Sequence, residues 1–324
     1  MRRLCLCILI FICHNSFAIH LGKVDPHSIS PVGAIVKIET SDFKYAKSFG
    51  YYPSIKVKCS LVRIAKNKAI TNTHCVYPYI NEQGKWLQDE HHSIFVSFSK
   101  DLSNYGKYSD IKLYPIKKII QQINYNDNQS VQKWNRYLNY ADDITWEEII
   151  NYFVPRDIAI IEFEVDPREN KINIAKLQSS NSYLNQIPVT VSGYGPVYFD
   201  KLDNNGIRRV NSGTLVKRIP SFFENDNISW FVGVRNQGGL PTDSGGFIGE
   251  IKQGIFDLHG LIVIAPYEIE TLDNETKKYY SAIKQFRPRD IVWINKMINK
   301  LNQIKNSNSV EILYNDIMKN GDVK

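Results

Sequence analysis

The chain has 324 residues, of which 43% are hydrophobic and 23% charged, so it can bury one large core or two modest ones. This balance excludes a chain that is mostly disordered. The formal net charge of +7 is spread along the sequence without a dense Lys/Arg stripe. That distribution favours a solvated surface over a face that binds nucleic acid.

The N-terminus carries the three parts of a secretory signal. Two arginines precede the apolar run Leu4–Cys13, and the small-residue cleavage site Ser16-Phe17-Ala18 follows. We therefore expect residues 1–18 to be a signal peptide and the protein to be secreted or periplasmic. The apolar run is too short for a stable anchor, and no other segment reaches the roughly 18 apolar residues of a spanning helix. The mature protein should then have no membrane anchor, an uncleaved anchor being the alternative.

Cysteine usage adds to this interpretation. Cys5, Cys7 and Cys13 lie in the predicted signal peptide, so only Cys59 and Cys75 remain in the mature chain. An even pair in a chain sent to an oxidising compartment predicts one disulfide. Two free buried thiols are the alternative.

Short β-type runs recur between turn signals, which indicates an all-β barrel or sandwich. The runs are Ala34–Glu39, Ile55–Ile64, Ser93–Ser99, Ile111–Ile120, Ile158–Glu164, Val189–Gly193, Gly213–Arg218, Trp230–Val234, Gly246–Gly249 and Leu258–Ala265. Two segments break the pattern. Ser130–Phe153 is rich in Trp, Tyr and paired acids and is predicted to be partly helical, and Arg289–Ile304 repeats apolar residues at helical spacing after a proline. The polar tail 305–324 is expected to be loosely held.

Two motifs supply a candidate base and its partner. His74 ends an apolar strand and adjoins Cys75. A disulfide from Cys75 to Cys59 would fix the backbone that aims the imidazole, as general-base catalysis requires. Asp157 leads into the apolar run Ile158–Phe163, where a carboxylate could hold a histidine in one tautomer. Taken alone, a His beside a Cys is more often structural, and an Asp there is often a strand-start cap.

A third motif, Thr242-Asp243-Ser244-Gly245-Gly246, supplies a candidate nucleophile. A serine between an aspartate and two glycines suits a tight loop that presents its hydroxyl beside backbone N–H groups. A plain turn is the alternative for this motif by itself.

With these flanks, the order His74, Asp157, Ser244 resembles the trypsin-like (chymotrypsin-fold) serine peptidases. The resemblance covers nearly the whole mature chain. Further segments that carry it are Ser30–Ile35, Val191-Ser192-Gly193-Tyr194-Gly195, His259–Val263 and Tyr280–Ile294.

The resemblance implies an all-β fold of two six-stranded antiparallel β-barrels (chymotrypsin-like) with a C-terminal α-helix. It implies a peptidase domain over residues 19–304. The first barrel would span about 30–165, the second about 186–284 and the helix about 289–304.

The resemblance also implies roles. Ser244 would attack the scissile carbonyl, His74 would transfer the proton, and Asp157 would orient His74. The main-chain N–H groups of Thr242 and Ser244 would form the oxyanion hole. The substrate would be a protein or peptide, with no metal, cofactor or nucleic acid needed. His91-His92 lacks a partner at metal spacing and is interpreted as a solvated loop.

Family members are activated when a new N-terminal amine pairs with the aspartate before the nucleophile. Cleavage after Ala18 would leave Ile19 as that terminus and Asp243 as its partner. The alternative is that this terminus is loose and that Asp243 has another donor.

Several positions depart from the family. Thr242 replaces a glycine, which could remove one oxyanion donor. Gly238 and Val263 are assigned to the substrate pocket. Val263 replaces a serine that supports the triad aspartate, and Gly238 lacks the acid that selects Arg or Lys. The segment 130–153 is an insertion that could narrow the cleft or bind a partner. An active serine endopeptidase is the leading interpretation. The alternatives are a catalytically inactive homologue that binds proteins and an unrelated β adhesin.

Overall fold

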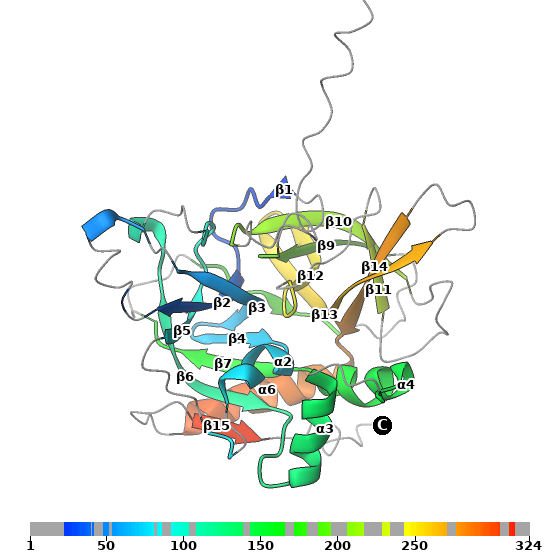
Figure 1. The fold of residues 1–324 in the computed structure, drawn as a ribbon. Helices are drawn as coiled ribbons and strands as arrows, with labels where there is room; N and C mark the ends of the chain where they lie inside the picture. The colour runs from blue at the N-terminus through cyan, green and yellow to red at the C-terminus, as the bar shows by residue number, and fades with distance from the viewer. Residues whose placement is uncertain are drawn as a thin grey trace, which may run out of the picture.

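The chain folds mostly into β-strands, which close into two six-stranded antiparallel barrels, as predicted. The structure is a computed structural model (Figure 1). It describes residues 23–39, 41, 48–51, 54–80, 83–85, 92–103, 108–138, 143–165, 172–179, 187–195, 206–216, 229–233, 243–270, 277–304 and 311–314.

The first barrel follows the order β6-β5-β2-β3-β4-β7 and closes where β6 pairs with β7. Its strands are β2(Val32–Glu39), β3(Lys56–Ala65), β4(Lys68–Thr71), β5(His92–Ser97), β6(Tyr114–Gln121) and β7(Ala159–Phe163). Buried β-branched side chains dominate these strands, because such side chains pack well on a pleated surface. Alternate residues of β3 and β7 face two different apolar clusters, so both faces of these strands are covered.

The second barrel follows the order β10-β11-β14-β13-β12-β9 and closes where β10 pairs with β9. Its strands are β9(Ile187–Gly193), β10(Arg209–Val216), β11(Ser229–Gly233), β12(Phe247–Lys252), β13(Ile255–Glu270) and β14(Lys277–Gln285). Two short strands extend it: β1(Lys23–Val24) pairs with β10, and β8(Lys176–Leu177) pairs with β13. The largest apolar cluster contains residues of both barrels and of the C-terminal helix, which joins the barrels into one packed unit.

The insertion between β6 and β7 is helical, in agreement with the prediction for Ser130–Phe153. It comprises α3(Asn128–Leu138), α4(Trp146–Glu148), the π-helix η3(Ile149–Phe153) and α5(Val154–Arg156). Figure 1 shows α3 and α4 in green at the lower side of the molecule. A buried cluster of Ile123, Val131, Trp134, Tyr137 and Phe153 holds these helices together, with the rings of Tyr137 and Phe153 stacked at 4.3 Å between centroids.

Further short helices connect strands of the first barrel. The first barrel also carries α2(Thr73–Val76) and the single-turn helices η1(Tyr77–Tyr79) and η2(Tyr108–Asp110). None of the helices within the described ranges is long and apolar enough to cross a membrane.

The C-terminal helix α6(Pro288–Gln303) agrees with the prediction for residues 289–304. It buries Trp293, Ile294, Met297 and Leu301 on one face, at the spacing of an amphipathic helix. Polar contacts hold both of its ends. Lys284 forms a buried ion pair of 2.9 Å with Asp290 in the first turn, and Lys118 Nζ donates to the carbonyl of Ile304 at 2.8 Å just after the last.

Part of the predicted loose tail belongs to the first barrel. Residues Glu311–Tyr314 form β15, which pairs in parallel with residues 118–121 of β6. The expectation of a loose tail is therefore wrong for these four residues. They fill the edge of β6 beyond its short pairing with β5, which covers only Tyr114 and Pro115. The other residues of 305–324 lie outside the described ranges.

Candidate active site

His74 is presented by a sharp transition from strand to helix. The chain leaves β4 at Thr71 and turns at Asn72, whose backbone is extended, before α2 begins at Thr73. The turn is attached to the start of β7 by two side chains. Asn72 Nδ2 donates to the Asp157 carbonyl at 2.8 Å, and Thr73 Oγ1 donates to the Ile158 carbonyl at 2.9 Å. These two bonds fix the backbone of His74 relative to Asp157.

Asp157 lies at the corner between α5 and β7. Its backbone has φ −80° and ψ 62°, and the Ile158 N–H donates to the Arg156 carbonyl at 2.8 Å, which is the pattern of an inverse γ-turn. The side chain is fully buried. Its carboxylate accepts His74 Nδ1 at 2.7 Å and the His74 main-chain N–H at 3.0 Å. Because an ionised carboxylate only accepts hydrogen bonds, this pairing assigns the ring proton to Nδ1 and leaves Nε2 as the nitrogen that can accept a proton.

Ser244 lies on a tight turn. The Gly246 N–H donates to the Asp243 carbonyl at 2.8 Å, which makes Ser244 the second residue and Gly245 the third residue of a β-turn. Gly245 has φ +80°, a conformation that costs other residues strain. A Cβ there would also overlap Thr71 Oγ1, so the sequence Ser-Gly suits the turn for two independent reasons.

Two contacts join this turn to the first barrel, next to His74. The Ser60 main-chain N–H donates to the Ser244 carbonyl at 2.9 Å. Cys75 Sγ lies 3.7 Å from the same carbonyl oxygen. Cys59 and Cys75 form the predicted disulfide, with their Cα atoms 5.8 Å apart. The neighbours of Ser60 and His74 are therefore covalently linked, and the structure brings all three candidate catalytic residues to the junction of the barrels.

The Ser244 hydroxyl points to a different acceptor from the one that catalysis needs. It donates to the Val263 carbonyl at 3.4 Å, and among the described residues no hydrogen bond joins it to His74. Val263 is buried in a cluster with Ile150, Val154, Trp230 and Ala282. Ile150 and Val154 come from the helical insertion, so the insertion packs directly beside the Ser244 site. Catalytic hydrogen bonds are often long or misaligned without substrate, so this arrangement does not exclude a nucleophilic role.

Asp243, just before Ser244, is fully buried. Its Oδ1 accepts the Gly195 N–H at 2.7 Å, and a Cβ on Gly193 or Gly195 would overlap its carboxylate. The negative charge of Asp243 also acts on Arg209, whose pKa is lowered by burial and partly restored by that charge. The ion pair that we predicted between Asp243 and Ile19 involves a residue outside the described ranges and stays a prediction.

Two other predicted positions lie outside the described ranges. They are Thr242, assigned to the oxyanion hole, and Gly238, assigned to the substrate pocket. Both assignments stay predictions, as does the signal peptide over residues 1–18.

Three potential metal ligands gather at the site without forming a metal-binding set. Donor atoms of Cys59, His74 and Cys75 lie within 4.8 Å of one another. The two sulfur atoms are joined in the disulfide, however, and therefore lack the thiolate form that binds metals.

The residues that orient the site were not predicted from the sequence. Asn72 and Thr73 attach the His74 turn to β7, and Ser60 attaches Ser244 to the first barrel. A signal for the first two existed, since they are polar residues between an apolar strand and the candidate base. Ser60 is an ordinary strand residue in the sequence and gave no signal.

Comparison of the chain with models of known protein families found no match, and comparison with curated proteins found none at a significant level.

Proposed function

We propose that the protein is a secreted serine endopeptidase that uses Ser244, His74 and Asp157. The observation that carries this proposal is the buried Asp157 carboxylate on His74 Nδ1, next to the Ser244 turn, at the junction of two six-stranded barrels. The double-barrel fold is consistent with a chymotrypsin-like protease. A histidine fixed in one tautomer beside a serine on a tight turn is suited to acyl transfer.

The proposed reaction has two halves. Ser244 Oγ attacks the scissile carbonyl carbon while His74 Nε2 accepts the hydroxyl proton, and Asp157 stabilises the resulting imidazolium. The proton then passes to the leaving amine, the C–N bond breaks, and an acyl-enzyme remains. Water attacks the ester with His74 again as base, which releases the acid and restores Ser244. The main-chain N–H groups of Ser244 and Thr242 would bind the oxyanion.

Substrate and location are part of the same proposal. Without an acid at Gly238, we propose that protein or peptide substrates with uncharged residues before the cut are preferred over those with Arg or Lys. Export is supported by the basic and apolar start of the sequence and by the disulfide between Cys59 and Cys75, since disulfides persist in oxidising compartments.

A second candidate function is a catalytically inactive homologue that binds proteins through the same surface. The observation that favours it is that, among the described residues, the Ser244 hydroxyl is bonded to the Val263 carbonyl and not to His74, the base that would activate it. The two candidates differ in one observable property, which is whether Ser244 reacts with a serine-directed electrophile.

The test is labelling of the purified, exported protein with a fluorophosphonate probe. The wild-type protein is expected to take up one label on Ser244, and Ser244→Ala none. The matched control is Ser212→Ala, which removes an exposed serine of β10 and should label like the wild type. Absence of label on a folded wild-type protein would refute the peptidase and leave the binding protein as the better candidate.

A further inference from the structure

A fully buried ion pair lies away from the candidate triad, at the boundary between the barrels. Arg208 Nε donates to Asp25 Oδ2 at 2.7 Å, and both side chains have no exposed surface. Arg208 precedes β10 of the second barrel, whereas Asp25 follows β1 near the start of the described chain. Burying two charges is costly unless their remaining hydrogen-bonding groups are satisfied. The other hydrogen bonds of Arg208 and Asp25 therefore determine which segments this pair holds together.

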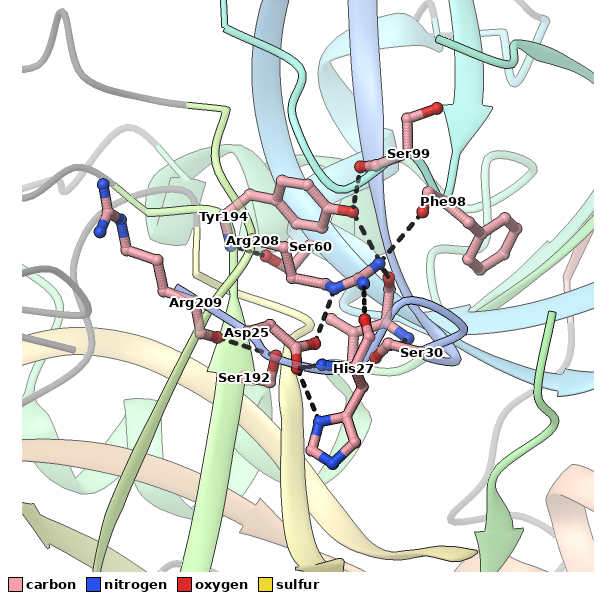
Figure 2. A network of polar contacts seen from close by, with 11 residues as sticks. Asp25, His27, Ser30, Ser60, Phe98, Ser99, Ser192, Tyr194, Arg208 and Arg209 are labelled. Carbon is pink, nitrogen blue, oxygen red and sulfur yellow. Dashed lines mark hydrogen bonds and ion pairs between the residues drawn. The ribbon is translucent and has the colours of Figure 1, made fainter. Parts of the chain in front are cut away.

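The guanidinium group of Arg208 uses its other N–H groups to hold main-chain carbonyls of three segments (Figure 2). Nη1 donates to Phe98 at 3.1 Å and to Val32 at 3.3 Å, and both residues belong to the first barrel or its adjoining loop. Nη2 donates to His27 at 2.7 Å. The planar fork of one arginine thus fixes the second barrel against the first barrel and against the N-terminal segment.

Both carboxylate oxygens and the main-chain N–H of Asp25 also have hydrogen-bond partners. Its Oδ1 accepts the main-chain N–H of His27 at 2.9 Å and the His27 Nδ1 at 2.7 Å, while Oδ2 is used by Arg208. The Asp25 main-chain N–H donates to the Arg208 carbonyl at 3.0 Å. Figure 2 shows this carboxylate between the imidazole of His27 and the guanidinium of Arg208. The N-terminal segment is therefore a fixed part of the boundary.

Tyr194 connects this pair to the candidate active site. Its hydroxyl donates to the Ser99 carbonyl at 2.7 Å and is 3.5 Å from the Val32 carbonyl, an acceptor that it shares with Arg208. Its main-chain N–H donates to Ser60 Oγ at 3.0 Å. Burial raises the pKa of the Tyr194 hydroxyl, so it stays protonated and remains a donor.

The final contacts reach the Ser244 turn itself. Ser60, which accepts from Tyr194, donates its main-chain N–H to the Ser244 carbonyl. Gly195, next to Tyr194, donates its N–H to the carboxylate of Asp243. Tyr194, which shares the Val32 carbonyl with Arg208, is thus connected to the turn that carries Ser244 through Ser60 and Gly195.

We propose that Arg208, held by Asp25, is a positioning residue. It fixes the position of the second barrel relative to the first and so places Ser244 relative to His74. This inference rests on the proposed function in that the readout is Ser244 reactivity. Arg208 touches none of the reacting groups and acts through Tyr194 and Ser60. Displacement of a nucleophile by about 1 Å can cost roughly 100-fold in rate, so a small shift of the barrels is enough to be measured.

The experiment compares Arg208→Met, Asp25→Asn and the double variant with the wild type. Arg208→Met should lower kcat and the fluorophosphonate labelling rate by about 10- to 100-fold per folded molecule, with KM near the wild-type value. Removing Arg208 alone also leaves the buried Asp25 carboxylate without its arginine partner and with only the bonds from His27, so the single variant should unfold at lower urea. The double variant should regain stability but not kcat, because the bonds to Phe98 and Val32 are still missing.

The matched control is Lys284→Met, which breaks another buried ion pair, that with Asp290 at the start of α6. It should unfold at lower urea and yet keep the wild-type kcat. A wild-type kcat per folded molecule in Arg208→Met, or a kcat that returns with stability in the double variant, would overturn the proposal. If Arg208→Met does not fold, Arg208→Lys keeps the charge without the fork and is expected to show the same loss of kcat.

A second measurement separates this inference from the proposed function. Amide hydrogen exchange at Ser60 and Gly195 reports their bonds to Ser244 and Asp243 and requires no catalysis. Exchange at both should be faster in Arg208→Met than in Lys284→Met at matched global stability. If the wild type neither labels nor hydrolyses but this difference is present, the proposed function fails and the positioning role stands. Equal exchange in the two variants would show that Arg208 does not position the turn.

Discussion

The carboxylate of Asp157 holds His74 at two points, since it accepts both the Nδ1–H at 2.7 Å and the main-chain N–H at 3.0 Å. Asp157→Asn would place an amide where the acceptor of Nδ1–H now lies. The other tautomer would then be favoured, and Nε2 would carry the proton instead of accepting it. We expect kcat to fall by about 10⁴-fold with the fold intact.

The measurement is peptide hydrolysis alongside circular dichroism. Asp143→Asn is the matched control, because Asp143 pairs with Arg136 at an exposed site on the insertion. It should leave kcat unchanged. A wild-type kcat in Asp157→Asn would remove Asp157 from the mechanism.

Gly195 lies against the carboxylate of Asp243, so Gly195→Ala should disturb the turn that carries Ser244. The added Cβ would overlap Asp243, and its displacement would break the bond from the Gly195 N–H. Loss of a hydrogen bond to a buried group costs about 1–3 kcal/mol, and the Ser244 labelling rate should fall as well. Gly254→Ala is the control, because Gly254 has φ +77° in open space. It should cost about 1–2 kcal/mol of stability from strain alone and leave labelling unchanged. Similar labelling rates in the two variants would contradict the prediction.

The disulfide between Cys59 and Cys75 should be a main source of stability in the first barrel. Replacing both residues by alanine opens a loop whose closure is worth about 3 kcal/mol on the chain-entropy account. The free energy of unfolding in urea, compared with that of the wild type, measures the loss. Alkylation of the exported wild-type protein without reductant should find neither cysteine reactive. Two reactive thiols in that sample would show that the bond does not form.

His259 should make stability depend on pH. Burial lowers its pKa below the ordinary 6.5, and the nearby charges of Glu250 and Asp257 only partly oppose this. The unfolded chain therefore binds a proton before the folded chain does, and stability falls as the pH drops below about 6.5. We expect the free energy of unfolding to decrease less between about pH 8 and pH 5 in His259→Gln than in the wild type. Equal decreases in the two proteins would mean that His259 stays equally protonated in both states.

Much of the fold was predictable because it follows from local pattern. The ten β-type runs match ten strands with ends that differ by up to five residues, and Arg289–Ile304 matches α6, since alternation and helical spacing are properties of short windows. The barrel strands β4 and β14 were not among those runs. The approach of His74 to Asp157 was also expected, although from the order of three motifs rather than from any local signal.

What was not predicted depends on partners that are distant in sequence. Residues Glu311–Tyr314 are a short run among polar residues, and only the free edge of β6 makes them a strand. Arg208 and Asp25 are separated by most of the chain, and a charged residue in a sequence is expected on the surface. Their burial follows from the carbonyl groups that the boundary between the barrels leaves to be paired.

The strands β1 and β15 have a consequence for how the protein is made. The early strand β1 pairs with the second barrel, and the late strand β15 pairs with the first. Each barrel closes on its own strands, but each also gains one short strand that is synthesised with the other barrel. Contacts of such long sequence separation form slowly, so β15 should join the first barrel later than the strands that close it. In a chain that crosses a membrane N-terminus first, β15 can pair only after residues 311–314 have crossed, so the edge of β6 should be the last part of the first barrel to become protease-resistant.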